Sequence, residues 1–356
     1  MSNLKKVLVM AGGTGGHVFP ALAIAKALEK QGVEILWLGT RGRMEEQLVP
    51  KYGFDIKYID VKGVRRNGLK TLLKAPFMIV KAIMQARKVI QEFKPDVVLG
   101  MGGYASGPGG AAAFLSGIPV VLHEQNAAAG MTNKLLFKIA SRVMLGFPGA
   151  FKGDKVTVVG NPVRESIIAL NSIERCYDKP VINIAIVGGS LGAQALNNLV
   201  PKALTKFNIP QIKVVHQCGK GNSEKVKPLY DGAIFDVEVC DFIDDMDALY
   251  KDTDLMICRA GALTVAEVSC ARLPAIFVPL PTAVDDHQTK NAMVMQNNGA
   301  AIVCKQSELD EDKLFNLVDD LVNKKDKLQQ MSDNSYKCSI VNATDRVVEI
   351  LESLVN

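Results

Sequence analysis

The feature that most constrains the fold of this chain is a local pattern that occurs twice: an apolar strand, a glycine-rich turn and an amphipathic helix. In the first copy the strand is 7–10 and the turn is Gly-Gly-Thr-Gly-Gly-His, 12–17. In the second the strand is 181–187 and the turn is Gly-Gly-Ser-Leu-Gly-Ala, 188–193. Glycine lets a ligand approach the backbone, and the first N–H groups and dipole of the helix point at it. We therefore expect two halves of like construction, each with a turn suited to an anion or polar ligand.

Apolar, mostly β-branched segments alternate with helical patterns along both halves. In the first half they are 7–10, 35–38, 55–59, 97–100, 120–123, 142–145 and 156–159. In the second they are 181–187, 213–217, 235–239, 255–258, 275–278 and 301–303. This alternation predicts an α/β fold with a doubly wound parallel sheet in each half. Ligands bind at the carboxyl ends of the strands in such sheets, so we expect a ligand cleft between the halves.

The 356 residues are enough for two domains with separate cores. The segment Gly160-Asn161-Pro162-Val163-Arg164 has the composition of a hinge. We expect an N-terminal domain of 1–162 and a C-terminal domain of 163–342. The amphipathic segment at the end, 343–356, is expected to form a helix that packs back on the first domain.

The first glycine turn differs from a dinucleotide-binding fingerprint, because Val18 stands where its third glycine would be. The second strand is followed by Arg41, which suits a 2′-phosphate, and no acid for a ribose follows it. An NADP-dependent oxidoreductase is therefore kept as an alternative function. A second glycine loop, 102–110, suggests a large polar ligand in the same half, although close helix packing also explains some of its glycines.

Polar side chains follow several strands at their carboxyl ends. In His-Glu-Gln-Asn, 123–126, Asn126 suits a sugar hydroxyl and Glu124 suits a base or an orienting group. A capping cluster for a helix that begins near Gly130 is the alternative for Asn126. Glu267 is expected in the first turns of a helix, where it suits the two hydroxyls of a ribose or, alternatively, a capping box. Gln288, in the polar segment after the next strand, suits a hydroxyl-rich ligand.

Between residues 57 and 94 the charge is strongly positive and bulky apolar residues are interleaved with it. The basic residues are Lys57, Lys62, Arg65, Arg66, Lys70, Lys74, Lys81, Arg87, Lys88 and Lys94. This pattern favours attachment to an anionic membrane surface through 72–80, helped by Phe114, and a helix with a solvated basic face is the alternative. Nucleic-acid binding is disfavoured because aromatic residues are few. The long uncharged run 97–122 is broken by glycines and prolines, so we expect no transmembrane helix there.

Taken together and in order, the motifs resemble those of the MurG family of bacterial glycosyltransferases. They are Gly-Gly-Thr-Gly-Gly-His, Gly-Gly-Tyr-x-Ser-Gly-Pro-Gly, His-Glu-Gln-Asn, Gly-Asn-Pro-Val-Arg, Gly-Gly-Ser-x-Gly-Ala, Phe-Ile-Asp-Asp-Met and Arg-x-Gly-Ala-Leu-Thr-x-x-Glu. The resemblance implies the GT-B fold, two Rossmann-like domains that face an interdomain cleft. It implies transfer of N-acetylglucosamine from UDP-GlcNAc to lipid I, giving lipid II for peptidoglycan, and hence a role in cell shape and division.

The resemblance also implies a peripheral location on the cytoplasmic face of the inner membrane, no cofactor and no metal, with other cell-wall synthesis proteins as candidate partners. A soluble UDP-GlcNAc epimerase with the same architecture is an alternative. The substrate-binding residues that the resemblance implies are Thr14, Gly15, Gly16, Asn126, Arg164, Ser190, Ile243, Ala262, Leu263, Thr264, Val265, Ala266, Glu267 and Gln288. Within that set, Ile243 reads uracil through its backbone, Glu267 binds the ribose diol, and Arg164 and Ser190 lie near the donor diphosphate.

The mechanism we expect is a direct displacement with inversion, in which the acceptor's 4-hydroxyl attacks the anomeric carbon and UDP leaves. Negative charge that grows on the diphosphate would be stabilised by Ser190, Arg164, glycine N–H groups and a helix dipole. His17 is the first candidate for the base that takes the acceptor proton, and Glu124 is the second.

Overall fold

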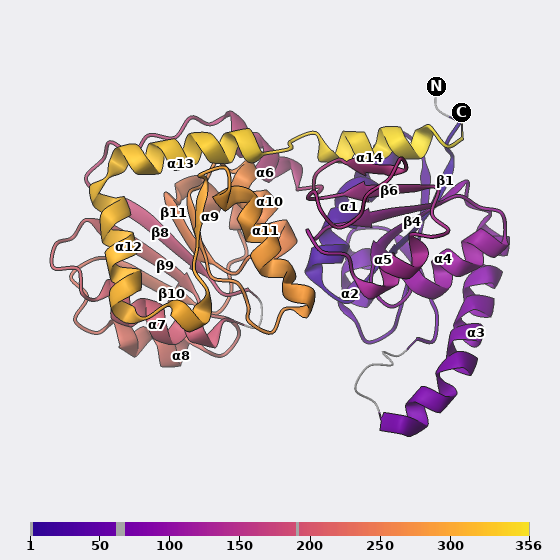
Figure 1. Ribbon diagram of the computed structural model, residues 1–356, viewed down its shortest axis with the longest axis horizontal. Coiled ribbons are helices and arrows are strands. Elements are labelled where there is room, and N and C mark those ends of the chain that lie inside the picture. Colours follow the sequence, from indigo (N-terminus) through magenta and orange to yellow (C-terminus); the bar gives the residue numbers. More distant parts are fainter. Residues whose placement is uncertain (1–2, 62–67, 190–191, 356) are drawn as a thin grey trace. The chain divides into compact units, whose positions relative to one another are not determined.

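The computed structural model describes residues 3–61, 68–189 and 192–355, and from 68 to 74 it describes the backbone only. It divides into two compact units, one of Met1–Arg164 with Val341–Asn356 and the other of Glu165–Ile340. The predicted division at residues 162 and 342 differs from this by two residues at each point. Each unit is built on a parallel sheet, as the sequence predicted, so the fold class is confirmed (Figure 1).

Unit 1 contains a seven-stranded parallel sheet in the order β3-β2-β1-β4-β5-β6-β7. The strands are β1 Lys6–Ala11, β2 Glu34–Gly39, β3 Asp55–Tyr58, β4 Val97–Gly102, β5 Val120–Glu124, β6 Arg142–Leu145 and β7 Val156–Val158. The helices are α1 Gly15–Lys30, α2 Met44–Lys51, α3 Gly68–Phe93, α4 Ser106–Leu115, α5 Met131–Leu136 and α14 Ala343–Glu352.

Both faces of this sheet are covered, because successive residues of a strand point to opposite sides. From β1, Val7 and Val9 pack in one cluster with residues of α1 and α14. Leu8 and Met10 pack on the other side with residues of α3 and α4. Helix α14 contributes Val347, Val348 and Leu351 to the first cluster, and Figure 1 shows it in yellow beside α1.

Unit 2 contains a six-stranded parallel sheet in the order β10-β9-β8-β11-β12-β13. The strands are β8 Ile182–Val187, β9 Ile212–Gln217, β10 Val237–Cys240, β11 Leu255–Cys258, β12 Ala275–Phe277 and β13 Ala301–Val303. The α-helices are α6 Glu165–Ala169, α7 Gln194–Leu204, α8 Ser223–Val226, α9 Met246–Asp252, α10 Ala262–Cys270, α11 His287–Gln296, α12 Glu311–Asn323 and α13 Lys325–Cys338. Short 3-10 helices are η1 Leu170–Ser172, η2 Lys227–Tyr230, η3 Val284–Asp286 and η4 Gln306–Glu308.

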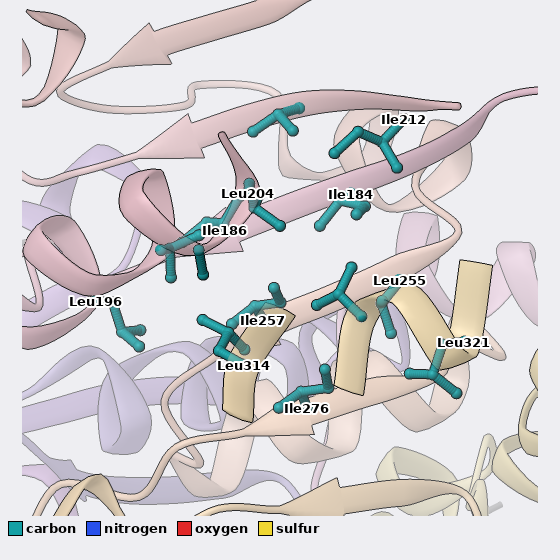
Figure 2. Close-up of a cluster of buried hydrophobic side chains, with 14 of the residues drawn as sticks. Ile184, Ile186, Leu196, Leu204, Ile212, Leu255, Ile257, Ile276, Leu314 and Leu321 are labelled. Carbon is teal, nitrogen blue, oxygen red and sulfur yellow. The ribbon is translucent and has the colours of Figure 1, made fainter. Parts of the chain in front are cut away.

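The core of unit 2 lies between its sheet and the helices α7 and α12. Figure 2 shows Ile184, Ile257 and Ile276 of the sheet beside Leu196 of α7 and Leu314 of α12. All of these side chains are buried. Every predicted strand is present, with ends that differ by two residues at most. Among the described residues, no helix is both long and apolar enough to cross a bilayer.

Candidate active site

The first glycine turn is held by a buried carboxylate that the sequence did not single out. Thr14 is the N-cap of α1, and Gly13 before it has φ +89°. The Glu45 side chain, 1% exposed, accepts a hydrogen bond from the Gly13 N–H at 2.9 Å. Its other oxygen accepts from the Thr40 N–H at 3.2 Å and hydroxyl at 2.9 Å. Glu45 therefore fixes the turn that carries the predicted residues Thr14, Gly15 and Gly16.

The second glycine loop packs directly on the first. The Gly12 N–H donates to the Gly102 carbonyl at 3.2 Å. Gly103 has φ +95°, and a Cβ on it would lie 2.6 Å from the Gly12 carbonyl oxygen. A Cβ on Gly102 would lie 2.9 Å from the His17 ring. Gly102 and Gly103 are required for the close approach of the two loops. Close packing, the alternative to ligand binding, therefore explains these two glycines.

His17 lies in the first turn of α1 and is partly exposed. Its Nδ1 is 2.9 Å from the Gly12 carbonyl oxygen. A carbonyl only accepts hydrogen bonds, so this contact assigns the proton of neutral His17 to Nδ1. Nε2 then carries a lone pair, which is the state that a general base needs.

Glu124 uses both carboxylate oxygens to organise the loop that follows β5. One oxygen accepts from the backbone and side-chain N–H groups of Asn126, at 3.1 and 3.3 Å. The other accepts from the Gly130 N–H at 3.0 Å and from Asn133 Nδ2 at 2.9 Å. Glu124 is 2% exposed. Of the two roles predicted for Glu124, a base and an orienting group, these contacts support the orienting group. The N-cap of α5 is Gly130 and not Asn126.

His123, in the same motif, is buried in the core of unit 1. Its Nε2 lies 2.9 Å from the Gly160 carbonyl, and Gln125 Nε2 lies 3.1 Å from its Nδ1. Burial lowers the pKa of His123 to about 4, so the ring is neutral near pH 7. His123 therefore links the end of β5 to the segment that leads to Arg164, the last residue of this part of unit 1.

In unit 2 a pocket of about 630 Å³ lies at the carboxyl ends of β8, β11 and β12. Its lining includes Gly188, Gly189, Gly192, Arg259, Gly261, Thr264, Gln288 and Gln306. Thr264 and Gln288 are predicted site residues, whereas predicted Ser190 lies outside the described residues. No group of three or more His, Cys, Asp or Glu side chains suited to a metal ion occurs in the described part of the chain.

Two side chains of this pocket are fixed by backbone groups. Gln288 Oε1 accepts from the N–H groups of Leu280 and Ala260, at 3.0 and 3.3 Å. These bonds orient the carboxamide, so its Nε2 is a donor that a sugar hydroxyl can use. Arg259 donates to the Val278 carbonyl at 2.9 Å and to the Gln306 side chain at 2.8 Å. Arg259 is not among the site residues predicted from the sequence, and its guanidinium places a positive charge in the pocket lining.

The second glycine turn is held by Gln217, another residue that sequence analysis missed. Its Oε1 accepts from the Gly189 N–H at 3.1 Å, and its Nε2 donates to the Gly189 carbonyl at 3.0 Å. Nε2 also donates to the Asp241 carbonyl at 2.9 Å. The Gln217 carboxamide thus continues the β8–β9 pairing into the turn and fixes a peptide of the pocket wall.

Helix α10 carries the predicted stretch Ala262, Leu263, Thr264, Val265, Ala266 and Glu267, and Gly261 is its N-cap. Glu267 lies one turn beyond Thr264 and is 9% exposed. The Tyr250 hydroxyl of α9 donates to Glu267 Oε2 at 3.0 Å. Predicted Ile243 lines a separate hollow of about 370 Å³ between α9 and the strands β8, β9 and β10.

Comparisons with known proteins agree with this architecture over nearly the whole chain. Residues 7–145 match the glycosyltransferase family 28 N-terminal domain, and residues 183–348 match the C-terminal domain of the same family. The UDP-N-acetylglucosamine--N-acetylmuramyl-(pentapeptide) pyrophosphoryl-undecaprenol N-acetylglucosamine transferase of Shewanella sp. (strain MR-4) is 52% identical over 353 residues, 98% of each chain. The crystal structure of Acinetobacter baumannii MurG is 43% identical, with a TM-score of 0.85 over 98% of this chain and 99% of that one.

The chain belongs to the MurG family. This confirms the resemblance that the motifs indicated, and the GT-B fold with it. A UDP-GlcNAc 2-epimerase from Neisseria meningitidis, solved with UDP-GlcNAc bound, is 15% identical to this MurG-family chain, with a TM-score of 0.70 over 98% of this chain and 99% of that one. That likeness shows a shared fold alone, so the epimerase alternative is not favoured over membership of the glycosyltransferases.

Proposed function

We propose that this chain transfers N-acetylglucosamine from UDP-GlcNAc to the 4-hydroxyl of N-acetylmuramic acid in lipid I, giving lipid II. The observation that carries the proposal is the 52% identity, over nearly full length, to a transferase named for that donor and acceptor. The pocket of unit 2, whose lining includes Arg259 and Gln288, and the paired glycine loops of unit 1 are the local geometry that supports it.

For the donor, we assign the pocket of unit 2 to the sugar and diphosphate of UDP-GlcNAc. Gln288 Nε2 donates to a sugar hydroxyl, and the N–H groups at the start of α10 face the phosphates. The turn held by Gln217 forms the neighbouring wall of the pocket. Arg164 and Ser190 are assigned to the diphosphate, Ile243 to uracil and Glu267 to the ribose. In unit 1, Thr14, Gly15, Gly16 and Asn126 are assigned to the substrate sugars.

The chemical step in this proposal is a displacement at the anomeric carbon. His17 Nε2 takes the proton of the attacking hydroxyl while the bond to the UDP oxygen breaks. The charge released on the diphosphate is met by Arg164, by backbone N–H groups and by the partial positive charge of the helix terminus. Glu124 keeps the loop of Asn126 in place and takes no proton, because its oxygens already accept four hydrogen bonds.

The acceptor dependence of UDP release tests the activity. A transferase releases UDP from UDP-GlcNAc only when a lipid-linked muramyl acceptor is present. An epimerase would instead convert UDP-GlcNAc without any acceptor, and an NADP oxidoreductase would bind a dinucleotide. Conversion of the donor in the absence of acceptor would contradict the proposal.

Replacing Glu267 by alanine is expected to raise the donor KM at least about 10-fold, because even one hydrogen bond to a charged group contributes about 1.5–3 kcal/mol. The acceptor KM should change little. Steady-state kinetics with each substrate varied in turn measures both constants. An unchanged donor KM would remove the ribose role of Glu267.

We also propose that unit 1 binds the cytoplasmic face of the inner membrane through an apolar patch on α3 and α4. The patch consists of Phe77, Val80, Met84, Phe114 and Leu115, all exposed and 54–79% accessible. Phe77, Val80 and Met84 are spaced to lie on one face of α3, and α3 packs against α4. Exposed Arg87 and Lys88 follow on the same helix and suit anionic headgroups.

Several residues of the predicted membrane segment lie outside the described residues. They are Lys62, Arg65 and Arg66, together with the side chains of Lys70, Leu72, Leu73 and Lys74. The proposal therefore depends on the described part of the patch. Other proteins of cell-wall synthesis are proposed as partners at the same membrane.

Replacing Phe77 and Val80 together by serine is expected to lower binding to anionic vesicles at least about tenfold, since burial of such a side chain is worth about 1.5–3 kcal/mol. Sedimentation with phosphatidylglycerol vesicles measures the change. The control is replacement of Ile209 and Ile234 by serine, which are similarly exposed side chains of unit 2. Equal binding by the two double variants would count against the patch.

A further inference from the structure

Glu267, the acid assigned to the ribose, is held by a side chain that touches no substrate in the proposal above. We propose that Tyr250 is a positioning residue, whose hydroxyl fixes the Glu267 carboxylate for the ribose hydroxyls of the donor. This inference rests on the proposed function, because it presumes that Glu267 binds a ribose. The contact itself is a 3.0 Å hydrogen bond from the Tyr250 hydroxyl to Glu267 Oε2, between two buried residues.

A glutamate that binds a diol must present its oxygens in one orientation. A glutamate side chain that moves freely loses conformational entropy when it is fixed in one orientation. A donor that is already in place fixes the carboxylate before the nucleotide arrives, so binding the ribose no longer costs that entropy. A carboxylate has about four lone-pair sites, so a single bond from a hydroxyl does not fill it.

Tyr250 suits this role because it is rigid relative to α10. Its side chain is 1% exposed. The Arg175 guanidinium donates to the carbonyl of Tyr250 at 2.7 Å, to that of Thr253 at 2.5 Å and to that of Ala271 at 2.7 Å. One side chain therefore ties the end of α9 to the end of α10, and the Tyr250 hydroxyl is held at a fixed place beside Glu267.

The same helix leads from the segment assigned to uracil. Ile243 precedes α9, and Asp245 caps that helix by accepting from the Ala248 N–H at 2.9 Å. Helix α9 therefore joins the backbone assigned to the base with the hydroxyl that orients the ribose acid. In this proposal the uridine is recognised by helix α9, with the segment that precedes it, and by the contact of α9 with α10.

The experiment compares Tyr250→Phe with the unchanged protein in the binding of UDP and of 2′,3′-dideoxyuridine diphosphate, by calorimetry. The expected result is a 5- to 30-fold weaker binding of UDP and a change within twofold for the dideoxy nucleotide, which has no hydroxyls for Glu267. A lower fraction of folded protein would weaken the apparent binding of both nucleotides equally. The ratio of the two dissociation constants therefore does not depend on how much of the variant is folded. In a Glu267→Ala background, Tyr250→Phe should have no further effect on UDP.

Tyr230→Phe is the matched control, since it removes a buried hydroxyl of the same unit that contacts His216 Nδ1 at 2.9 Å. It is expected to lower the melting temperature without changing the ratio. An unchanged ratio in Tyr250→Phe, or equal weakening of both nucleotides, overturns the positioning role. If Glu267→Ala itself leaves UDP binding unchanged, the ribose assignment under the proposed function has failed instead.

Discussion

Replacing His17 by alanine is expected to lower kcat by about 10²- to 10⁴-fold, the usual contribution of a general base. The reason is geometric: Nδ1 donates to the Gly12 carbonyl at 2.9 Å, which leaves the Nε2 lone pair for the acceptor proton. The affinity for UDP-GlcNAc should stay within a few-fold. Rapid-quench measurement of a single turnover separates the chemical step from product release.

His17→Asn distinguishes proton transfer from support of the glycine turn. The asparagine Nδ2 occupies about the position of histidine Nδ1, so it keeps the bond to Gly12 but supplies no base. We expect kcat of this variant to fall as far as that of His17→Ala. Recovery of most of the activity in His17→Asn would mean that His17 acts by holding the turn.

Replacing Gly192 by alanine is expected to destabilise unit 2 by about 2–5 kcal/mol and to abolish measurable donor binding at ordinary concentrations. Gly192 has φ +74°, and a Cβ on it would lie 2.1 Å from the carbonyl oxygen of Cys218. The turn must move to relieve this contact, and the turn forms part of the pocket wall. Chemical denaturation and calorimetry with UDP measure the two effects.

Gly221→Ala is the control for this prediction. Gly221 has φ +73°, nearly the same as Gly192, but a Cβ there meets nothing within 4 Å. This variant should cost only the backbone penalty of about 1–2 kcal/mol and bind UDP normally. If the two variants behave alike, the contact with Cys218 is not what requires glycine at 192.

The fold could be predicted because its signals are local. Strands such as β1 and β11 are short runs of apolar residues buried on both faces, and such runs are recognisable from sequence alone. The glycine turns were found for the same reason, since the glycines of each strand-to-helix turn lie within five residues of one another. Thr264 and Gln288, which were predicted from their position after strands, line the pocket of unit 2.

The residues that hold the site were missed because each acts across a long stretch of chain. Glu45 binds Gly13 from 32 residues away, and Gln217 binds Gly189 from 28 residues away. Nothing in a local pattern distinguishes either from a solvated polar residue. Burial and partner identity decide their roles, and both arise only when the sheet has formed.

Glu124 illustrates the opposite case, in which a local motif predicted a site residue but left two roles open. An acid at the end of a strand beside an asparagine fits a catalytic base and an orienting group equally well. The choice depends on how many donors surround the carboxylate. Two of the four donors come from Gly130 and Asn133, which lie outside the four-residue motif.

Helix α14 has a consequence for how the polypeptide is made. Val347, Val348 and Leu351 complete a core whose other members lie within the first 164 residues. During translation, the face of α1 that packs against α14 therefore stays uncovered until residues 343–352 have left the ribosome. The core of unit 2 lies entirely within residues 165–340 and has no such dependence, so unit 2 can finish folding before unit 1 does.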